Sequence, residues 1–61
     1  MKINIISAYL SHTNEVVAIA PNDYFVLKAE LSQDKAQEIV NKVNSVRVIE
    51  DSHWKKIKQN G

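Results

Sequence analysis

Serines, histidines and acids are the residues of this 61-residue chain that could carry catalysis, and they are scattered along its length. A Ser-His-Asp set could be assembled from them, but no spacing singles one out. The only glycine is Gly61, whereas the turn that exposes a nucleophilic serine and the loop that wraps a phosphate both need glycines within the chain. We therefore expect no catalytic residue and no cofactor site, and we expect the protein not to be an enzyme.

A metal site is also not expected. The chain has no cysteine, so it can form neither a disulfide nor a zinc site built on thiolates. Its two histidines, His12 and His53, fall in predicted turns without a third ligand at a recognisable spacing. The adjacent acids Glu50 and Asp51 also fall in a predicted turn, where both carboxylates are solvated and general acid catalysis is not expected.

The stretch 52–60 combines the only tryptophan with three of the eight basic residues. Lys55, Lys56 and Lys58 could contact phosphates while Trp54 stacks on a base, as in many proteins that bind single-stranded nucleic acid. Alternatively, Trp54 and Ile57 pack toward the core or its rim while the lysines solvate a sheet edge. The net charge of +1 favours the second interpretation, because a dedicated nucleic-acid binder is strongly basic.

The elements that must position the segment 52–60 begin with two predicted strands. Residues 2–10 are rich in isoleucine and predict one strand near the centre of a sheet, because both of its faces carry apolar groups. Residues 11–15 predict a hairpin loop and residues 16–20 the returning strand, which Pro21 ends. Alternation in the first strand places Ile3, Ile5 and Tyr9 on one face and Lys2, Asn4, Ile6, Ala8 and Leu10 on the other.

Residues 24–31 are ambiguous. As a strand they place Phe25, Leu27, Ala29 and Leu31 on one face and Tyr24, Val26, Lys28 and Glu30 on the other. As a helix capped by Asn22 or Asp23 they would bring Tyr24, Leu27 and Leu31 together. The aromatic and β-branched run favours the strand.

The clearest element is an amphipathic helix that begins after Ser32, a preferred N-cap. Asp34 falls in its first turn, where the helix dipole favours an acid. Asn44 and Ser45 are predicted to end it, since asparagine tolerates the left-handed conformation of a helix cap. The apolar stripe is formed by Ala36, Ile39, Val40 and Val43.

The last third predicts a strand over residues 46–50, with Val46 and Val48 opposite Arg47 and Ile49, and then a turn. Residues 54–59 either pair back on that strand as a hairpin, which we favour, or form one helical turn. The sequence thus predicts a single α+β domain over residues 1–61. We expect a small antiparallel sheet in the order β-β-β-α-β-β, with the amphipathic helix packed on one face.

One helix cannot cover all the apolar groups of such a sheet. Ile6, Ala8 and Leu10 on the first strand and Tyr24 and Val26 on the third exceed what it can bury. Either the C-terminal segment covers the second face with Trp54, or that face is a protein interface. The interface would be a symmetric dimer or a strand added to the edge of another protein's sheet.

We therefore expect a small protein-binding module that acts stoichiometrically as an inhibitor or adaptor of a larger protein. Phages and other mobile elements often encode small chains of this kind. A homodimer is a second arrangement, and a weak nucleic-acid-binding protein is the alternative function. No run of about 20 apolar residues is present and no export signal is recognisable, so we expect no membrane segment and a cytoplasmic location. The expected partner-binding residues are Tyr9, Tyr24, Arg47 and Trp54, joined by Lys55, Lys56 and Lys58 in the nucleic-acid alternative.

Overall fold

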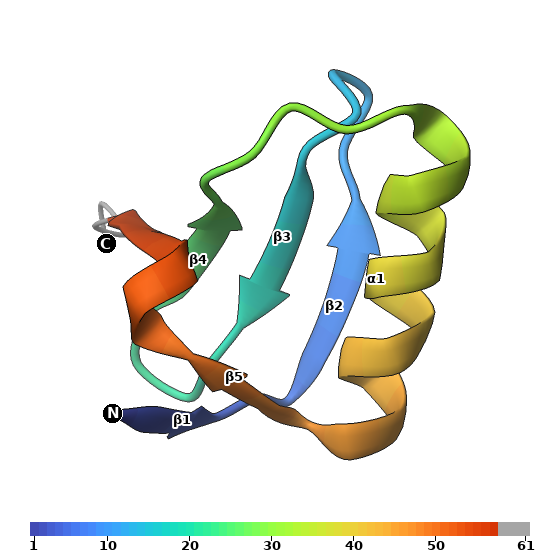
Figure 1. Cartoon of the computed structure of the whole chain (residues 1–61). Coiled ribbons are helices and arrows are strands. Elements are labelled where there is room, and N and C mark those ends of the chain that lie inside the picture. The colour runs from blue at the N-terminus through green and yellow to red at the C-terminus, as the bar shows by residue number, and fades with distance from the viewer. Residues whose placement is uncertain (58–61) are drawn as a thin grey trace.

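The computed structural model describes residues 1–57 and has the predicted α+β architecture, with the helix packed against a sheet (Figure 1). A single α-helix and six strands are present in this range. The helix is not long and apolar enough to cross a bilayer. The elements are β1 (Lys2–Asn4), β2 (Ser7–Leu10), β3 (Val16–Ile19), β4 (Tyr24–Leu27), α1 (Gln33–Val46), β5 (Val48–Glu50), the 3-10 turn η1 (Asp51–His53) and β6 (Trp54–Ile57).

The strands form two antiparallel sheets. The larger has four strands in the order β2-β3-β4-β6, and α1 packs against its β2 and β3 strands. The smaller consists of β1 and β5, which lie side by side below the larger sheet in Figure 1. In the smaller sheet Lys2 pairs with Glu50 and Asn4 with Val48.

The prediction of one continuous strand over residues 2–10 was wrong, because the chain changes partner at Ile5 and Ile6. The Ile5 amide donates to the Arg47 carbonyl at 2.8 Å, whereas the Ile6 amide donates to the Ile19 carbonyl at 2.7 Å. Ser7 is also paired with Ile19, so two successive residues oppose one, as in a β-bulge. The extra residue reverses the alternation of the faces, and both Ile5 and Ala8 therefore point into the core.

The loop 11–15 closes the predicted hairpin between β2 and β3. The Ser11 amide donates to the Glu15 carbonyl at 2.9 Å, and the Asn14 amide donates to the Ser11 carbonyl at 3.0 Å. Asn14 has a φ of 63°, a left-handed conformation that asparagine adopts more readily than most residues. The Ser11 hydroxyl also accepts hydrogen bonds from the amides of Thr13, at 3.3 Å, and Glu15, at 3.0 Å, so a side chain of the loop helps to satisfy its backbone.

The ambiguous segment 24–31 is a strand only as far as Leu27. Phe25 is buried, and Leu27 and Leu31 pack against the core from partly buried positions, as the strand interpretation predicts. The Lys28 amide still donates to the His53 carbonyl at 3.0 Å, which extends the contact with the C-terminal segment. Ala29 does not follow the predicted pattern, because it lies beyond the strand and is exposed.

The helix begins where predicted and ends later. The Ser32 hydroxyl accepts a hydrogen bond from the Lys35 amide at 3.3 Å, the contact of an N-cap. The helix continues to Val46, and Arg47 takes the left-handed position with a φ of 56°. The predicted end at Asn44 and Ser45 was wrong because the Asn44 side chain has a different role, which is to bind the backbone of Ala8 on β2.

The last two strands also differ from prediction in their partners. Val46 belongs to the helix, so β5 is shorter than predicted, and Ile49 points into the core. β6 is a strand, as favoured, but it pairs with β4 rather than with β5. The 3-10 turn between β5 and β6 redirects the chain from the smaller sheet to the larger one. The core is formed by Ile5, Ala8, Val16, Ala18, Ala20, Phe25, Ala36, Val40, Val43, Ile49 and Trp54.

Candidate protein-binding surface

The face of the four-stranded sheet opposite α1, here called the outer face, is the surface that the fold leaves without a helix. Ala8, Ala18 and Phe25 occupy one row across β2, β3 and β4, and all three point into the core. Their neighbours along each strand must point the other way, because successive side chains alternate. Strand pairing aligns these neighbours in two rows, Tyr9–Val17–Val26–Lys55 and Ser7–Ile19–Tyr24–Ile57.

The outer face is largely apolar and open to solvent. Tyr9 is 45% exposed and Ile57 is 41% exposed. Ile19, Tyr24 and Val26 are half-buried between them. Val17 is buried at the centre of the rows but is not part of the core cluster beneath α1. The two rows therefore form an aromatic and aliphatic surface that α1, on the other side of the sheet, does not cover.

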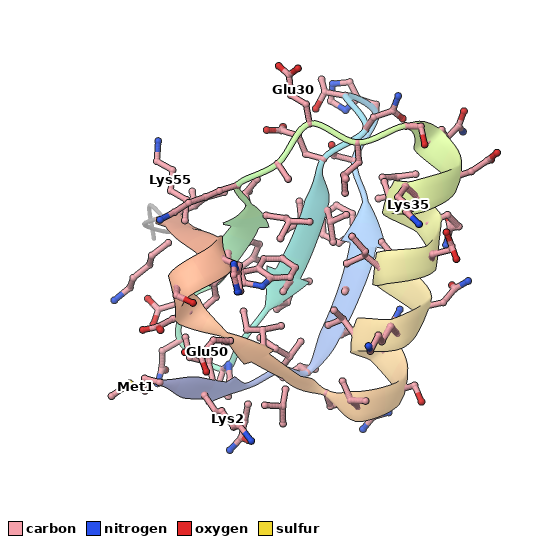
Figure 2. All side chains as sticks on the ribbon, viewed as in Figure 1. Met1, Lys2, Glu30, Lys35, Glu50 and Lys55 are labelled. Carbon is pink, nitrogen blue, oxygen red and sulfur yellow. The ribbon has the colours of Figure 1, made fainter. Side chains whose placement is uncertain are left out.

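Charged groups border this surface at its β6 end. Glu15, Val26, Lys55, Lys56 and Ile57 line a shallow hollow there. Figure 2 shows Lys55 extending away from the body of the molecule. The Nζ atom of Lys56 lies 3.4 Å from Asp23 Oδ1. Lys55 thus contributes a positive charge that no ion pair within residues 1–57 neutralises.

The acids nearest in sequence to these lysines are held elsewhere. The amino group of Met1 binds Glu50 Oε1, and it lies 3.2 Å from Asp51 Oδ1 (Figure 2). Hydrogen bonds to Glu50, and then to Asp51, raise the pKa of this amino group above its ordinary value of 8.0. The contact joins the start of β1 to the end of β5, beside the smaller sheet.

The predicted partner-binding residues are only partly brought together. Tyr9, Tyr24 and Lys55 lie on the outer face. Trp54 pairs with Leu27 and is 7% exposed within the core, so its ring is not available to a partner. Arg47 caps α1, away from β6 (Figure 1). Lys56 is exposed but pairs with Phe25, so it lies on the face of the sheet opposite to Lys55. Lys58 lies outside the described residues.

The predicted apolar surplus was correct for β4 and for Ile6, and wrong for Ala8 and Leu10. Tyr24 and Val26 lie on the outer face as predicted, whereas Ala8 and Leu10 pack into or against the core. The bulge explains the difference, because it reverses the faces after Ile6, which is itself 54% exposed. Trp54 does not cover the outer face, since it lies on the helix side of the sheet.

Three residues of the outer face, Val17, Ile19 and Ile57, were missed. Val17 and Ile19 occur in a strand that is apolar on both faces, so only its pairing shows which residues face away from the helix. Ile57 was predicted to accompany Trp54 toward the core. Alternation along β6 could have corrected this, because residues 54 and 57 of one strand point to opposite faces.

The alternative nucleic-acid surface is not assembled within residues 1–57. It requires an exposed Trp54 beside Arg47 and the lysines, whereas Trp54 is buried and Arg47 lies at the end of α1. His12 and His53 stay exposed in separate segments. No three His, Asp or Glu side chains of the described residues are grouped as metal ligands. Comparison with protein-family models, with curated proteins and with solved structures finds no match to this chain.

Proposed function

We propose that the chain is a non-enzymatic protein-binding module, which acts stoichiometrically on a larger protein by covering part of that protein's surface with its outer face. The observation that supports this proposal is the pair of rows opposite α1, in which Tyr9, Tyr24 and Ile57 reach solvent. Contiguous exposed apolar surface on a small protein commonly marks an interaction site. An inhibitor or an adaptor would both use such a surface.

The residue types of the outer face suit an interface. Tyrosine provides a large contact area with few rotatable bonds, and its hydroxyl group tolerates both solvent and a buried hydrogen bond. Tyr9 and Tyr24 lie on β2 and β4, with β3 between them, so both rings can contact one partner. Glu15 and Lys55 border the apolar rows and supply the polar rim that interfaces usually have.

A binding role in the cytosol fits the composition. The chain has no cysteine, which is compatible with a reducing compartment. Its hollows are shallow surface features, and a chain of this size has little room for a cleft that encloses a substrate. Binding without turnover is therefore the activity we propose.

Affinity capture from cells that encode the chain, followed by reconstitution with the purified partner, tests the proposal. Tyr9→Lys and Ile57→Lys place a charge on the outer face and should weaken the reconstituted complex at least tenfold. Val46→Lys is the matched control, because Val46 is an exposed apolar residue, 54% accessible, at the far end of α1. The control should leave the affinity unchanged.

Three results would contradict the proposal. The first is a partner that binds the Tyr9 and Ile57 variants as well as the parent chain. The second is a chain that only pairs with itself, seen by sedimentation. The third is binding to oligonucleotides that falls steeply with added salt, since an apolar interface responds little to salt.

A further inference from the structure

The two edges of the four-stranded sheet differ, and the difference bears on how a partner binds. On β2, the Ala8 amide donates to Asn44 Oδ1 at 2.7 Å, and Asn44 Nδ2 donates to the Ala8 carbonyl at 3.0 Å. One side-chain amide thus pairs both backbone groups that the middle of β2 would offer to another strand. The β2 edge is closed by the protein's own helix.

The β6 edge has no such cover within residues 1–57. The Lys28 amide donates to the His53 carbonyl, which makes residues 28 and 53 a hydrogen-bonded pair. Antiparallel pairs alternate, so Val26 with Lys55 and Tyr24 with Ile57 are also hydrogen-bonded. The backbone groups of Trp54 and Lys56 therefore point away from β4.

Most of these outward groups have no hydrogen-bond partner among residues 1–57. The Trp54 amide is used, because it donates to the Asp51 carbonyl at the end of η1. The Trp54 carbonyl and the amide and carbonyl of Lys56 remain on the open edge. A donor between two acceptors is the pattern that one strand presents to the next.

The side chains of β6 indicate which kind of strand fits. Lys55 and Lys56 are both exposed, and Glu50 and Asp51, the nearest acids in sequence, are bound to the amino group of Met1. Lys56 lies 3.4 Å from Asp23, so Lys55 is the lysine of β6 without an ion pair within residues 1–57. Lys55 and Ile57 are two residues apart on β6, so both side chains lie on the outer face. A strand laid beside β6 is complementary when it places an acidic side chain near Lys55 and an apolar one near Ile57.

A second copy of the chain fits this edge poorly. Antiparallel pairing of two β6 strands would bring the lysines of both copies next to one another, and like charges on neighbouring strands destabilise a ladder. Edge lysines are a common means by which proteins avoid pairing with themselves. The same lysines favour an acidic segment from a different protein.

We infer that β6 accepts an extended, acidic segment of a partner protein as a fifth strand, which continues the outer face and gives a 1:1 complex. The inference rests on the proposed protein-binding function and names the partner's chemistry. Backbone hydrogen bonds at Lys56 supply the register, and an acidic and an apolar side chain two residues apart on the outer face supply the selectivity. The closed β2 edge leaves β6 as the edge of the four-stranded sheet where such a segment can add.

A titration of the isotope-labelled chain with synthetic peptides, followed by amide NMR, tests the inference. The probe places glutamate and valine two residues apart, so that both side chains lie on one face, beside Lys55 and Ile57. Its two counterparts carry lysine in place of glutamate or a proline at the centre. We expect the acidic probe to bind at least tenfold more tightly than either counterpart. We also expect it to slow hydrogen exchange at the Lys56 amide and to leave the chain monomeric in sedimentation.

Two variants test whether the probe binds at the β6 edge. Lys56→Pro removes the outward amide without breaking the ladder to β4, and it should weaken binding at least tenfold. Lys55→Glu combined with Lys56→Glu keeps the backbone and should reverse the preference to the lysine peptide, so the test survives if the proline variant does not fold. Lys35→Glu combined with Lys42→Glu, at two exposed positions of α1, is the charge-matched control and should change little.

Several outcomes would overturn the inference. These are no binding of the acidic probe at millimolar concentration, equal binding by Lys56→Pro, or signal changes confined to α1. Tyr9→Lys separates the inference from the proposed function, because Tyr9 lies on β2 and β6 is the opposite edge. If a partner requires Tyr9 but the acidic probe does not bind, the proposed function stands and the inference that β6 accepts an acidic segment is rejected.

Discussion

The Asn44 side chain forms two hydrogen bonds with the backbone of Ala8, at 2.7 Å and 3.0 Å, and so attaches the end of α1 to the edge of the sheet. An asparagine side chain carries a carbonyl acceptor and N–H donors in one plane, as a peptide group does. It therefore takes the place of a neighbouring strand. At this point one polar side chain adds two hydrogen bonds to the apolar packing of α1 on β2.

Replacement of Asn44 by alanine should destabilise the chain by about 1–3 kcal/mol, since both backbone groups of Ala8 lose their partner. Urea unfolding measures the loss, and hydrogen exchange at the Ala8 amide should become faster. Asn41→Ala is the control, because Asn41 makes only an exposed side-chain bond with Gln37. Equal effects at both positions would show that the edge contact contributes nothing.

Replacement of Arg47 by glycine should stabilise the chain. The φ of 56° costs an L-residue about 1 kcal/mol or more, and glycine adopts it without strain. For a domain of this size, a gain of about 1 kcal/mol raises the melting temperature by roughly 4–8 °C. Arg47→Val, whose branched side chain tolerates this conformation least, should lower it. A lower melting temperature for the glycine variant would contradict a structural role for this cap.

Replacement of Trp54 by alanine should remove most of the stability. Truncation of a buried aromatic residue costs about 3–5 kcal/mol, and a chain of this length has roughly 3–9 kcal/mol in total. Calorimetry should show a weak or absent cooperative transition. Ile57→Ala on the same strand, where the side chain is 41% exposed, should change the melting temperature little. A fully stable alanine variant at position 54 would place the tryptophan outside the core.

The contact between Met1 and the acids after β5 predicts a pH dependence at alkaline pH. The amino group has a pKa raised above 8.0, so its stabilising effect is complete below that value and is lost as the pH rises through the raised pKa. The melting temperature should therefore be unaffected by this group below pH 8.0 and should fall as the pH rises above it. An Nα-acetylated chain should show no such fall, and the same slope in both chains would refute the prediction.

Periodicity was sufficient to predict the helix, the hairpin loop and the strand at Tyr24–Leu27. The apolar spacing of Ala36, Val40 and Val43 matches the buried stripe of α1. The reversal at Ile6 was not predictable, because a bulge depends on which strand lies opposite and leaves no mark in an isoleucine-rich segment. The partner of β6 depends in the same way on contacts between distant segments.

The outer face was only half visible in the sequence. Tyr24 and Val26 alternate clearly with buried neighbours, so their side of β4 followed from the pattern. Trp54 was ambiguous, because a tryptophan beside lysines occurs both in cores and on binding surfaces. The helix was predicted to end too early because asparagine is common at helix ends. The Asn44 side chain instead binds the backbone of β2.

Pairing of Lys2 with Glu50 has a consequence for how the chain folds as it is synthesised. The meander of β2, β3 and β4 joins near neighbours in sequence and can form early, whereas β1 must wait until β5 has been synthesised. Until then Ile3 and Ile5 have no partner strand. We expect closure of this distant ladder to be the last step of folding, and nascent chains that stop before residue 48 to be recognised by chaperones.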